Sequence, residues 1–448
     1  MRSCIPALCG ALAFVASAST LYASETAVAS GPSGGSGGLA LSTQQVSSAP
    51  PALSDLLEEL LAQNPSVLAR KASVRASRLS QSAAWNQRLP SLSVTGQSRS
   101  RQGDEPRGEV RVQQPLYAGG RIDALNRQAV AQADAAAQAL ELVRRELSLR
   151  LVQAVTELHR FERRRLAAET DVAEHRRLAG IMERRVQAGQ SPSMEADLVR
   201  ARLATSESNI LQLHTQVAKL KEKLQQLMGR PVGQLPSVTL PSALALEQSS
   251  DALLAIVRET SPELGRLRAD RDEALAEVDR IRAELLPGLN LRWSRQRQSA
   301  ASSLGLDAAY ENQTVVEMTL TPAPGLASAY RVAAAKQTAD ATQDLIRAAE
   351  RDLVDRLYSQ LEDFKGLGPR IALARQAMAS SAEVAQSYAR LFAVGRRSWL
   401  DTLNAQRELT DLAYQLADLE MTEVQLGIQL AIEIGRWDLV CPRGCLPN

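Results

Sequence analysis

Four cysteines and three histidines are the side chains best suited to redox or metal chemistry in this 448-residue chain. Cys441 and Cys445 lie in a C-P-R-G-C stretch close to the C-terminus. An even pair in an exported protein can close a small disulfide loop, and the same spacing can also be incidental. Two thiols alone do not complete a tetrahedral zinc site. The pair therefore leaves a disulfide open and indicates no metal.

The histidines show no spacing typical of a ligand set. His159, His175 and His214 are scattered through segments of helical pattern without partners nearby, so solvated helix positions explain them better than metal binding. The chain also lacks a glycine-rich phosphate loop, a zinc-binding helix motif and a nucleophile elbow. Its net charge of +2 provides no strong field for nucleic acid. We therefore expect no enzyme, no metal and no cofactor.

The N-terminus has the pattern of an export signal. Arg2 precedes an apolar run from Ile5 to about Val15, and small residues follow, which predicts a signal peptide over residues 1–23. Cys9 lies inside the apolar run, too early for a lipoprotein cleavage site. Residues 24–52, which include GPSGGSGG, predict a flexible linker. No later window of about 18 apolar residues predicts a transmembrane helix.

The rest of the chain has the composition of long helices and contains an internal repeat. Alanine, leucine, glutamine and arginine dominate, and aromatic residues make up only 3%. An offset of 197 aligns Pro65 with Pro262 and Pro90 with Pro287. An offset of 206 aligns Gly189 with Gly395. We predict repeats at about 53–232 and 250–437, a linker at 233–249 and a tail at 438–448.

Both repeats predict the same order of elements. A helix with an early Asn-Pro or Ser-Pro break spans about 53–88 and about 251–286. Two short segments of alternating polarity follow, at about 89–118 and 287–322, and predict strands. Helical hairpins then occupy about 121–228 and 327–435, with a first helix of about 100 Å. A leucine spacing of seven within 140–158 predicts a coiled-coil seam. The GLGPR stretch at 366–370 predicts a kink.

The predicted strands leave two interpretations open. Each has one apolar face, as with Leu289, Leu291 and Trp293, which fits either outer-membrane strands or water-exposed hairpins packed on helices. Four strands cannot close a barrel, and an open edge in lipid leaves backbone groups without hydrogen bonds. If these strands span a membrane, the chain must therefore oligomerise.

With this doubled order of elements, the sequence resembles the TolC-type outer-membrane efflux proteins. The resemblance covers about 53–437 and rests on NPSVLARKASV, QPLYAGGRIDALNRQAVAQADA, VQAGQSPSMEADLVRARLA and FAVGRRSWLDTLNAQREL. It implies a mainly α fold with a small β part. It also implies a homotrimer with a 12-stranded outer-membrane β-barrel in lipid and a trimeric α-barrel extending into the periplasm of a Gram-negative bacterium. The implied partners are a periplasmic adaptor and an inner-membrane ABC or proton-driven transporter.

The resemblance also assigns residues to a periplasmic gate at the hairpin turns. Counting from Gly395, the gate positions carry Phe392, Arg397, Asp401 and Asn404, with Glu195 in the first repeat. Phe392 lacks the family's tyrosine hydroxyl and Asn404 lacks a carboxylate, so we expect a weakly latched gate. The resemblance is compatible with an Arg397–Glu195 link and a ring of three Asp401 carboxylates, but not with a second acidic ring. The turns expected to contact the adaptor are Gly189, Gln190, Ser191, Gly395, Arg396 and Ser398.

The same residues also fit ordinary helix capping. Gly189 and Gly395 suit left-handed C-caps, and Ser398 with Asp401 suits a capping box. Pro192 suits the first helical turn after Ser191. Capping and gating are compatible, so capping does not exclude a gate.

The resemblance leaves the exported substrate open. The absence of a predicted lipid anchor and the segment TPAPGLASAYR favour type I protein secretion over efflux of drugs or other small molecules. A periplasmic coiled-coil adaptor or scaffold is an alternative of another class. An adaptor would have one helical hairpin between β-rich halves, whereas this chain predicts two hairpins.

Overall fold

The computed structural model describes residues 52–97, 107–234, 236–238, 250–297, 310–320 and 327–437. The predicted signal peptide, most of both predicted linkers and the tail with Cys441 and Cys445 lie outside the described residues. The chain divides into two units, Met1–Ser48 and Ala49–Asn448. All elements below belong to the second unit.

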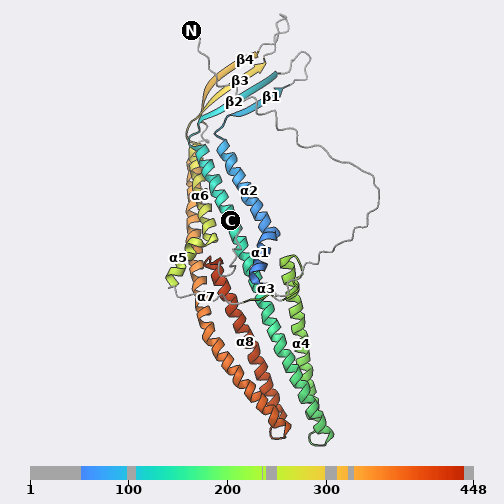
Figure 1. Ribbon diagram of the computed structural model, residues 1–448. Coiled ribbons are helices and arrows are strands. Elements are labelled where there is room, and N and C mark those ends of the chain that lie inside the picture. The colour runs from blue at the N-terminus through green and yellow to red at the C-terminus, as the bar shows by residue number, and fades with distance from the viewer. Residues whose placement is uncertain are drawn as a thin grey trace, which may run out of the picture. The chain divides into compact units, whose positions relative to one another are not determined.

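One order of elements occurs twice along this unit (Figure 1). It begins with α1 (Leu53–Gln63), α2 (Pro65–Asn86), β1 (Ser91–Gln97), β2 (Arg107–Tyr117), α3 (Arg121–Gln187) and α4 (Ser193–Met228). It continues with α5 (Ser250–Thr260), α6 (Pro262–Ala283), β3 (Gly288–Arg297), β4 (Tyr310–Thr319), α7 (Ala327–Ala393) and α8 (Trp399–Glu433).

The early helix breaks lie at the expected prolines. Asn64 caps α2 and accepts a hydrogen bond from the Ser66 backbone N–H at 2.9 Å, and Pro65 follows it. Ser261 caps α6, where its hydroxyl accepts from the Leu264 N–H at 3.5 Å, and Pro262 follows it. Proline suits the first helical turn because its missing N–H has no intrahelical partner there. Each short helix therefore ends where the next begins.

The two longest helices, α3 and α7, have 67 residues each. Helix α7 continues through Gly366, Gly368 and Pro369 without interruption. Figure 1 shows α7 as a curved helix, and the kink expected at 366–370 stays a prediction. Pro369 still removes one intrahelical hydrogen bond, and a curve spreads this local loss over several turns. None of the described helices combines the length and apolar character needed to cross a membrane.

The four strands form one antiparallel sheet in the order β1-β2-β3-β4. Strands β2 and β3 pair with each other and so join the two repeats in one sheet. The sequence predicted a pair of strands in each repeat but not this pairing between the repeats. The register aligns Leu92 with Val112 and Val112 with Trp293, so apolar side chains share one face. Strands β1 and β4 are the two edges of this sheet.

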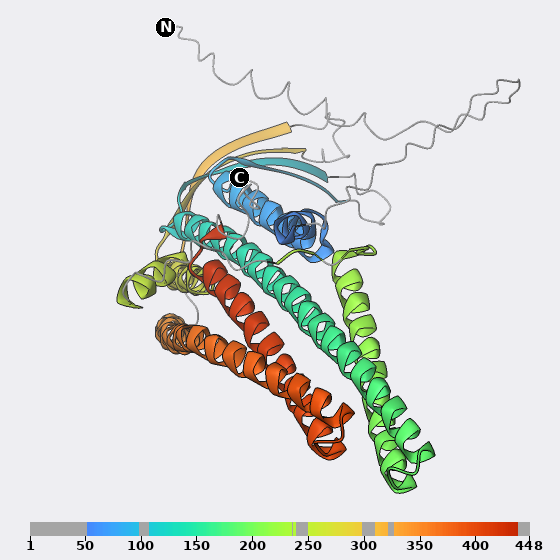
Figure 2. The same ribbon diagram turned by 60° about the horizontal axis from the view of Figure 1, so that its bottom comes forward.

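The main hydrophobic core lies where α1 packs between longer helices. The buried face of α1 consists of Leu53, Leu56, Leu57, Leu60 and Leu61, spaced as one face of an amphipathic helix. They belong to a cluster with side chains from α2, α3, α4 and α8. A second cluster joins α5, α6, α7 and α8. Figure 2 shows α3 and α4 as one hairpin and α7 and α8 as another. The sheet and the turns lie at opposite ends of α3 and α7.

Candidate gate at the helical turns

Glycines in the left-handed conformation end α3 and α7. Gly189 has φ +70° and Gly395 has φ +77°. After α3, the Gly189 and Gln190 N–H groups donate to the Val186 and Arg185 carbonyls. The same two bonds follow α7, where Gly395 and Arg396 donate to Phe392 and Leu391. This pattern is the Schellman motif, so the predicted glycine caps are confirmed at both turns.

The return helices begin differently. Ser398 caps α8, and its hydroxyl accepts from the Leu400 and Asp401 N–H groups at 3.1 and 3.4 Å. Pro192 occupies the N-cap position of α4, one residue before the helix, with an extended ψ of 146°. The prediction that Pro192 lies in the first helical turn was wrong by one residue. A proline in the N-cap has no side-chain oxygen, so only Ser398 supplies a side-chain cap.

Arg397 connects both sides of the second turn. Its Nε lies 3.3 Å from Asp401 Oδ2, and its Nη2 donates to the Tyr388 hydroxyl at 2.8 Å. Its guanidinium also lies over the Tyr388 ring, 4.3 Å from the centroid. Tyr388 was not predicted as a site residue. The sequence could have pointed to it, because Tyr388 lies one helical turn before Phe392 and therefore on the same face of α7.

Phe392 is a packing residue. Its side chain is 2% exposed, and it lies in a cluster with α3, α4 and α8 side chains that include Met182, Val199 and Leu403. The Arg185 guanidinium lies over its ring, 5.2 Å from the centroid. Phe392 therefore attaches the second hairpin to the first. Because phenylalanine has no hydroxyl, its burial here leaves no side-chain polar group without a hydrogen bond.

The remaining predicted gate residues lie near the starts of the return helices, Glu195 in the first turn of α4 and Asn404 in the second turn of α8. Asn404 is exposed on α8, and Glu195 is half-buried on α4. The structure brings Arg397 and Asp401 together. It does not join Arg397 to Glu195 among the described residues of one chain. A link between chains, like the ring of three Asp401 carboxylates, stays a prediction.

A groove of about 830 Å³ lies close to this turn. Side chains of α3 and α7 form its walls, and α8 contributes Gln406 and Leu409. Alanines dominate the α7 wall, and charged groups such as Glu174 and Arg390 also line the groove. Small side chains leave room for another helix to approach closely.

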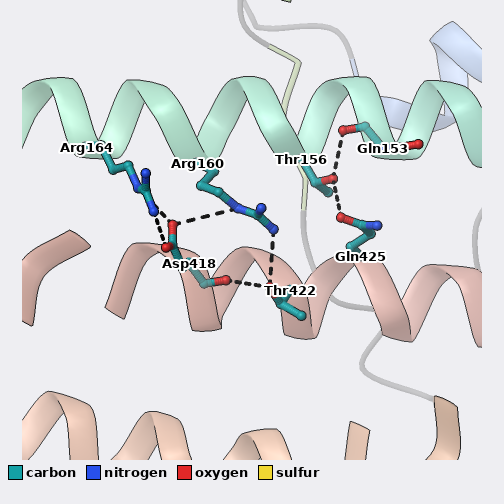
Figure 3. A network of polar contacts seen from close by, with 7 residues as sticks. All are labelled: Gln153, Thr156, Arg160, Arg164, Asp418, Thr422 and Gln425. Carbon is teal, nitrogen blue, oxygen red and sulfur yellow. Dashed lines mark hydrogen bonds and ion pairs between the residues drawn. The ribbon is translucent and has the colours of Figure 1, made fainter. Parts of the chain in front are cut away.

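Above the turn, polar side chains join α3 to α8 (Figure 3). Arg164 holds Asp418 with two hydrogen bonds, of which the Nε–Oδ1 bond is 2.9 Å. Arg160 donates to the Thr422 hydroxyl at 3.2 Å, and Thr156 donates to Gln425 at 3.3 Å. Since α3 and α8 come from different repeats, these contacts attach the first hairpin to the second.

A buried carboxylate lies between this polar seam and Phe392. Asp171 on α3 is 7% exposed. Its Oδ2 accepts from Ser206 on α4 at 2.6 Å, and its Oδ1 accepts from Thr410 on α8 at 2.9 Å. His175 Nδ1 lies 3.4 Å from Oδ1 and 2.9 Å from the Asp171 carbonyl. One carboxylate thus contacts side chains of three helices.

The pKa values of Asp171 and His175 shift in opposite directions. Burial opposes ionisation of Asp171, but hydrogen bonds from His175, Ser206 and Thr410 outweigh it and lower the carboxyl pKa. Burial also disfavours the His175 imidazolium, yet the hydrogen bond to Asp171 and its negative charge raise the pKa of His175. The geometry therefore favours an ion pair.

The solvated positions predicted for all three histidines were only partly right. His214 is exposed, but His175 is 5% exposed and paired. His159 is half-buried, and its Nε2 lies 2.6 Å from the Pro236 carbonyl. Burial lowers the pKa of His159 despite this hydrogen bond. The residues that the structure describes hold no cluster of three or more His, Cys, Asp or Glu able to bind a metal.

Comparison with known proteins identifies the family and two similar proteins. The profile of the family described as "Outer membrane efflux protein" matches residues 56–230 and 253–435. The pyoverdine export outer membrane protein OpmQ of Pseudomonas putida is 25% identical over 275 residues, which cover 60% of this chain and 57% of OpmQ. The proteases secretion protein PrtF of Dickeya chrysanthemi is 23% identical over 311 residues, 65% of this chain and 67% of PrtF.

Solved structures share the fold. The outer-membrane channel OprN superposes with a TM-score of 0.75 at 19% identity, covering 86% of this chain and 89% of that structure.

Proposed function

Because the chain belongs to the outer membrane efflux protein family, we propose that it is the exit duct of a tripartite export system. In this role it conducts substrate passively across the periplasm and the outer membrane. The family consists of outer-membrane channels of Gram-negative bacteria, not enzymes, which places the chain in that membrane. The observation that carries the proposal is the doubled set of long hairpins on a four-stranded sheet.

The sheet supports a trimer. Strands β1 and β4 end the sheet on either side, so pairing β4 of one copy with β1 of the next would satisfy both edges. Three copies would supply twelve strands and close a barrel. The shared face of Leu92, Val112 and Trp293 would then contact lipid, and the face of Ser93, Arg111 and Ser294 would line the lumen.

The helical turns would form the periplasmic end of the duct. In this proposal Gly189, Gln190, Ser191, Gly395, Arg396 and Ser398 contact a periplasmic adaptor. The adaptor would couple the duct to an inner-membrane ABC or proton-driven transporter. The groove beside α7 supports this role, because its alanine wall offers space for a helix of the adaptor.

The gate would consist of Arg397 and Asp401, with Glu195, Asn404 and Phe392 around them. Arg397 and Asp401 are already paired within the chain. A link from Arg397 to Glu195 of a neighbouring copy would require Arg397 to leave Asp401 or to bridge both carboxylates. The Tyr388 hydroxyl, which the resemblance did not single out, and the buried Phe392 side chain supply further contacts at this turn.

For the substrate, we favour secreted protein delivered by a type I system. The likeness to PrtF and the sequence TPAPGLASAYR support this choice. Export of a small molecule is the second candidate, because OpmQ, a pyoverdine export protein, is also similar. The chain spans 57% of OpmQ, so neither substrate transfers directly. A scaffold or adaptor disagrees with the family match.

Membrane fractionation tests the channel. We expect the full-length protein in the outer-membrane fraction, migrating as a detergent-resistant trimer on unheated gels and as a monomer after heating. A soluble periplasmic monomer would contradict the proposal.

Deletion of the gene separates the two substrates. Loss of particular proteins from the culture supernatant, with unchanged small-molecule export, would support type I secretion. The reverse result would favour small-molecule efflux. The identity of neighbouring genes for an ABC or proton-driven transporter provides an independent check.

A further inference from the structure

The buried Asp171–His175 pair on α3 also contacts two neighbouring helices. Asp171 contacts Ser206 on α4 and Thr410 on α8, so its carboxylate joins the first hairpin to the return helix of the second. It lies between the Arg164–Asp418 contact and the Phe392 cluster along α3. Any separation of α8 from α3 near the turn must break its bond to Thr410.

We propose that Asp171 and His175 form a proton-dependent clasp that holds α3, α4 and α8 together, and that loss of the His175 proton loosens it. The consequence for the channel gate rests on the proposed function, whereas the clasp itself does not.

Geometry explains why the charge of His175 matters. Both partners of Nδ1 are acceptors, namely the Asp171 carbonyl and carboxylate, so Nδ1 carries a hydrogen. The proton lost on titration is therefore the one on Nε2. The Nδ1 hydrogen bond to the Asp171 carbonyl survives this loss, but the positive charge beside the Asp171 carboxylate disappears. Asp171 is then a buried carboxylate without a neighbouring cation, which is unfavourable in a site of low polarity.

Other charged groups near the pair modify this balance without replacing it. On α3 itself, Glu174 also favours the imidazolium. On α4, Glu207 pairs with Arg176. On α8, Tyr414 lies under Arg164, and Asp411 pairs with Arg407. On α7, Glu383 and Arg390 line the adjoining groove with Glu174. Each of the nearest cations named here already has a partner.

The direction of the pH effect follows from the raised pKa of His175. Stabilisation by the imidazolium is fully present below the ordinary histidine value of 6.5 and is lost as the pH rises through the raised folded-state value. Asp171 stays ionised throughout this window because its pKa lies below the ordinary 3.8. The clasp is therefore closed in mildly acidic medium and loosened in alkaline medium.

Hydrogen exchange at the imidazole C2 position, followed by mass spectrometry on the full-length protein, measures the first step. The chain has three histidines, so each can be resolved in its own peptide. We expect the His175 midpoint above 6.5 and the His159 midpoint below it. Asp171→Asn, which keeps the shape but removes the charge, should lower the His175 midpoint by about one unit or more. An unchanged midpoint in this variant overturns the ion pair.

Single-channel recording in planar bilayers measures the second step. From pH 6 to pH 9, we expect mean conductance of the wild-type trimer to rise roughly twofold or more as the clasp loosens. His175→Gln should abolish this rise. His214→Gln, which changes an exposed histidine on α4, should retain it.

The outcomes separate the clasp from the channel. A wild-type pH response in His175→Gln overturns the clasp as a gate control. Normal His175 titration in a protein that forms no channel contradicts the proposed function and leaves the ion pair intact. If Asp171→Asn fails to fold, Thr410→Ser and Thr410→Val replace it. The serine variant keeps the hydroxyl and should retain the pH response, and the valine variant should weaken it. Equal responses would overturn the role of the Asp171–Thr410 bond.

Discussion

At the scale of single residues, the second turn combines a cap, an ion pair and an aromatic contact within a few side chains. Ser398 caps α8, while Arg397 contacts both Asp401 and Tyr388. Exposed ion pairs contribute little free energy by themselves, but a guanidinium held over an aromatic ring loses less freedom when it also binds a carboxylate. The Tyr388–Arg397–Asp401 set therefore acts as one unit.

Asp401→Ala tests the gate at this scale. Removing the carboxylate should reduce block of the channel by trivalent cations, because three Asp401 side chains would otherwise concentrate positive charge at the turn. Planar-bilayer recordings with and without a trivalent cation measure the change. Asp411→Ala, an exposed acid farther along α8, serves as the control. Unchanged block in Asp401→Ala would remove this residue from the gate.

Tyr388→Phe tests the tyrosine that sequence comparison did not identify. The variant loses the 2.8 Å bond to Arg397 and retains the ring. We expect more frequent channel opening if the bond helps to hold the turn closed, because a hydrogen bond to a charged group contributes a net free energy of about 1.5–3 kcal/mol. Tyr330→Phe, an exposed tyrosine near the start of α7, should have no effect. Identical opening frequencies in the two variants would contradict this role.

Phe392→Ala tests the packing of the turn. A buried phenylalanine replaced by alanine leaves a cavity, so local stability should fall by about 3–5 kcal/mol. Amide hydrogen exchange in the adjoining parts of α3, α4 and α8 measures this loss, and Phe392→Leu should restore most of it. Exchange that changes on α7 alone would show that Phe392 does not join the hairpins.

At the scale of elements, the two long hairpins end in the same backbone motif but differ in their surroundings. A Cβ added at Gly189 meets open space, whereas one at Gly395 would lie 3.2 Å from Arg185 Nη2. Arg185 in turn lies over Phe392. The second turn is thus connected to the first hairpin, and the first turn is the freer of the two.

A matched pair of substitutions measures this difference. Gly189→Ala and Gly395→Ala each place alanine at a positive φ and should each cost about 1–2 kcal/mol. Gly395→Ala should cost somewhat more, because it must also displace the end of Arg185. Amide exchange at the ends of α3 and α7 gives the two values. A larger effect at Gly189 would contradict the argument from surroundings.

At the scale of the whole molecule, the proposed barrel would place strands of neighbouring copies beside β1 and β4, the two edges of the sheet. Val94 is 71% exposed within one chain, and its register partner Val110 lies on the same face. Such exposure is unfavourable in water and suits a lipid-facing position. The adjacent Thr95 points to the opposite face, as successive residues of a strand do.

Arginine substitutions distinguish the two faces. Val94→Arg should reduce the amount of detergent-resistant trimer in the outer membrane, because an arginine facing lipid costs about 2–4 kcal/mol near the middle of the bilayer. Thr95→Arg should be tolerated on the lumen side. Quantitative unheated gels measure both. Equal yields would contradict a barrel with this orientation.

Local signals in the sequence determined most elements and the two turns. Proline after Asn64 or Ser261 starts a helix, glycine at 189 and 395 ends one, and alternating polarity marks the strands. These effects act over a few residues, so the chain alone reveals them. Only the tertiary structure decided which elements meet: β2 with β3, α3 with α8, Tyr388 with Arg397, and Asp171 with Ser206 and Thr410. Such contacts join residues far apart in the chain or on different faces, and their free energy depends on burial and partners that no local pattern specifies.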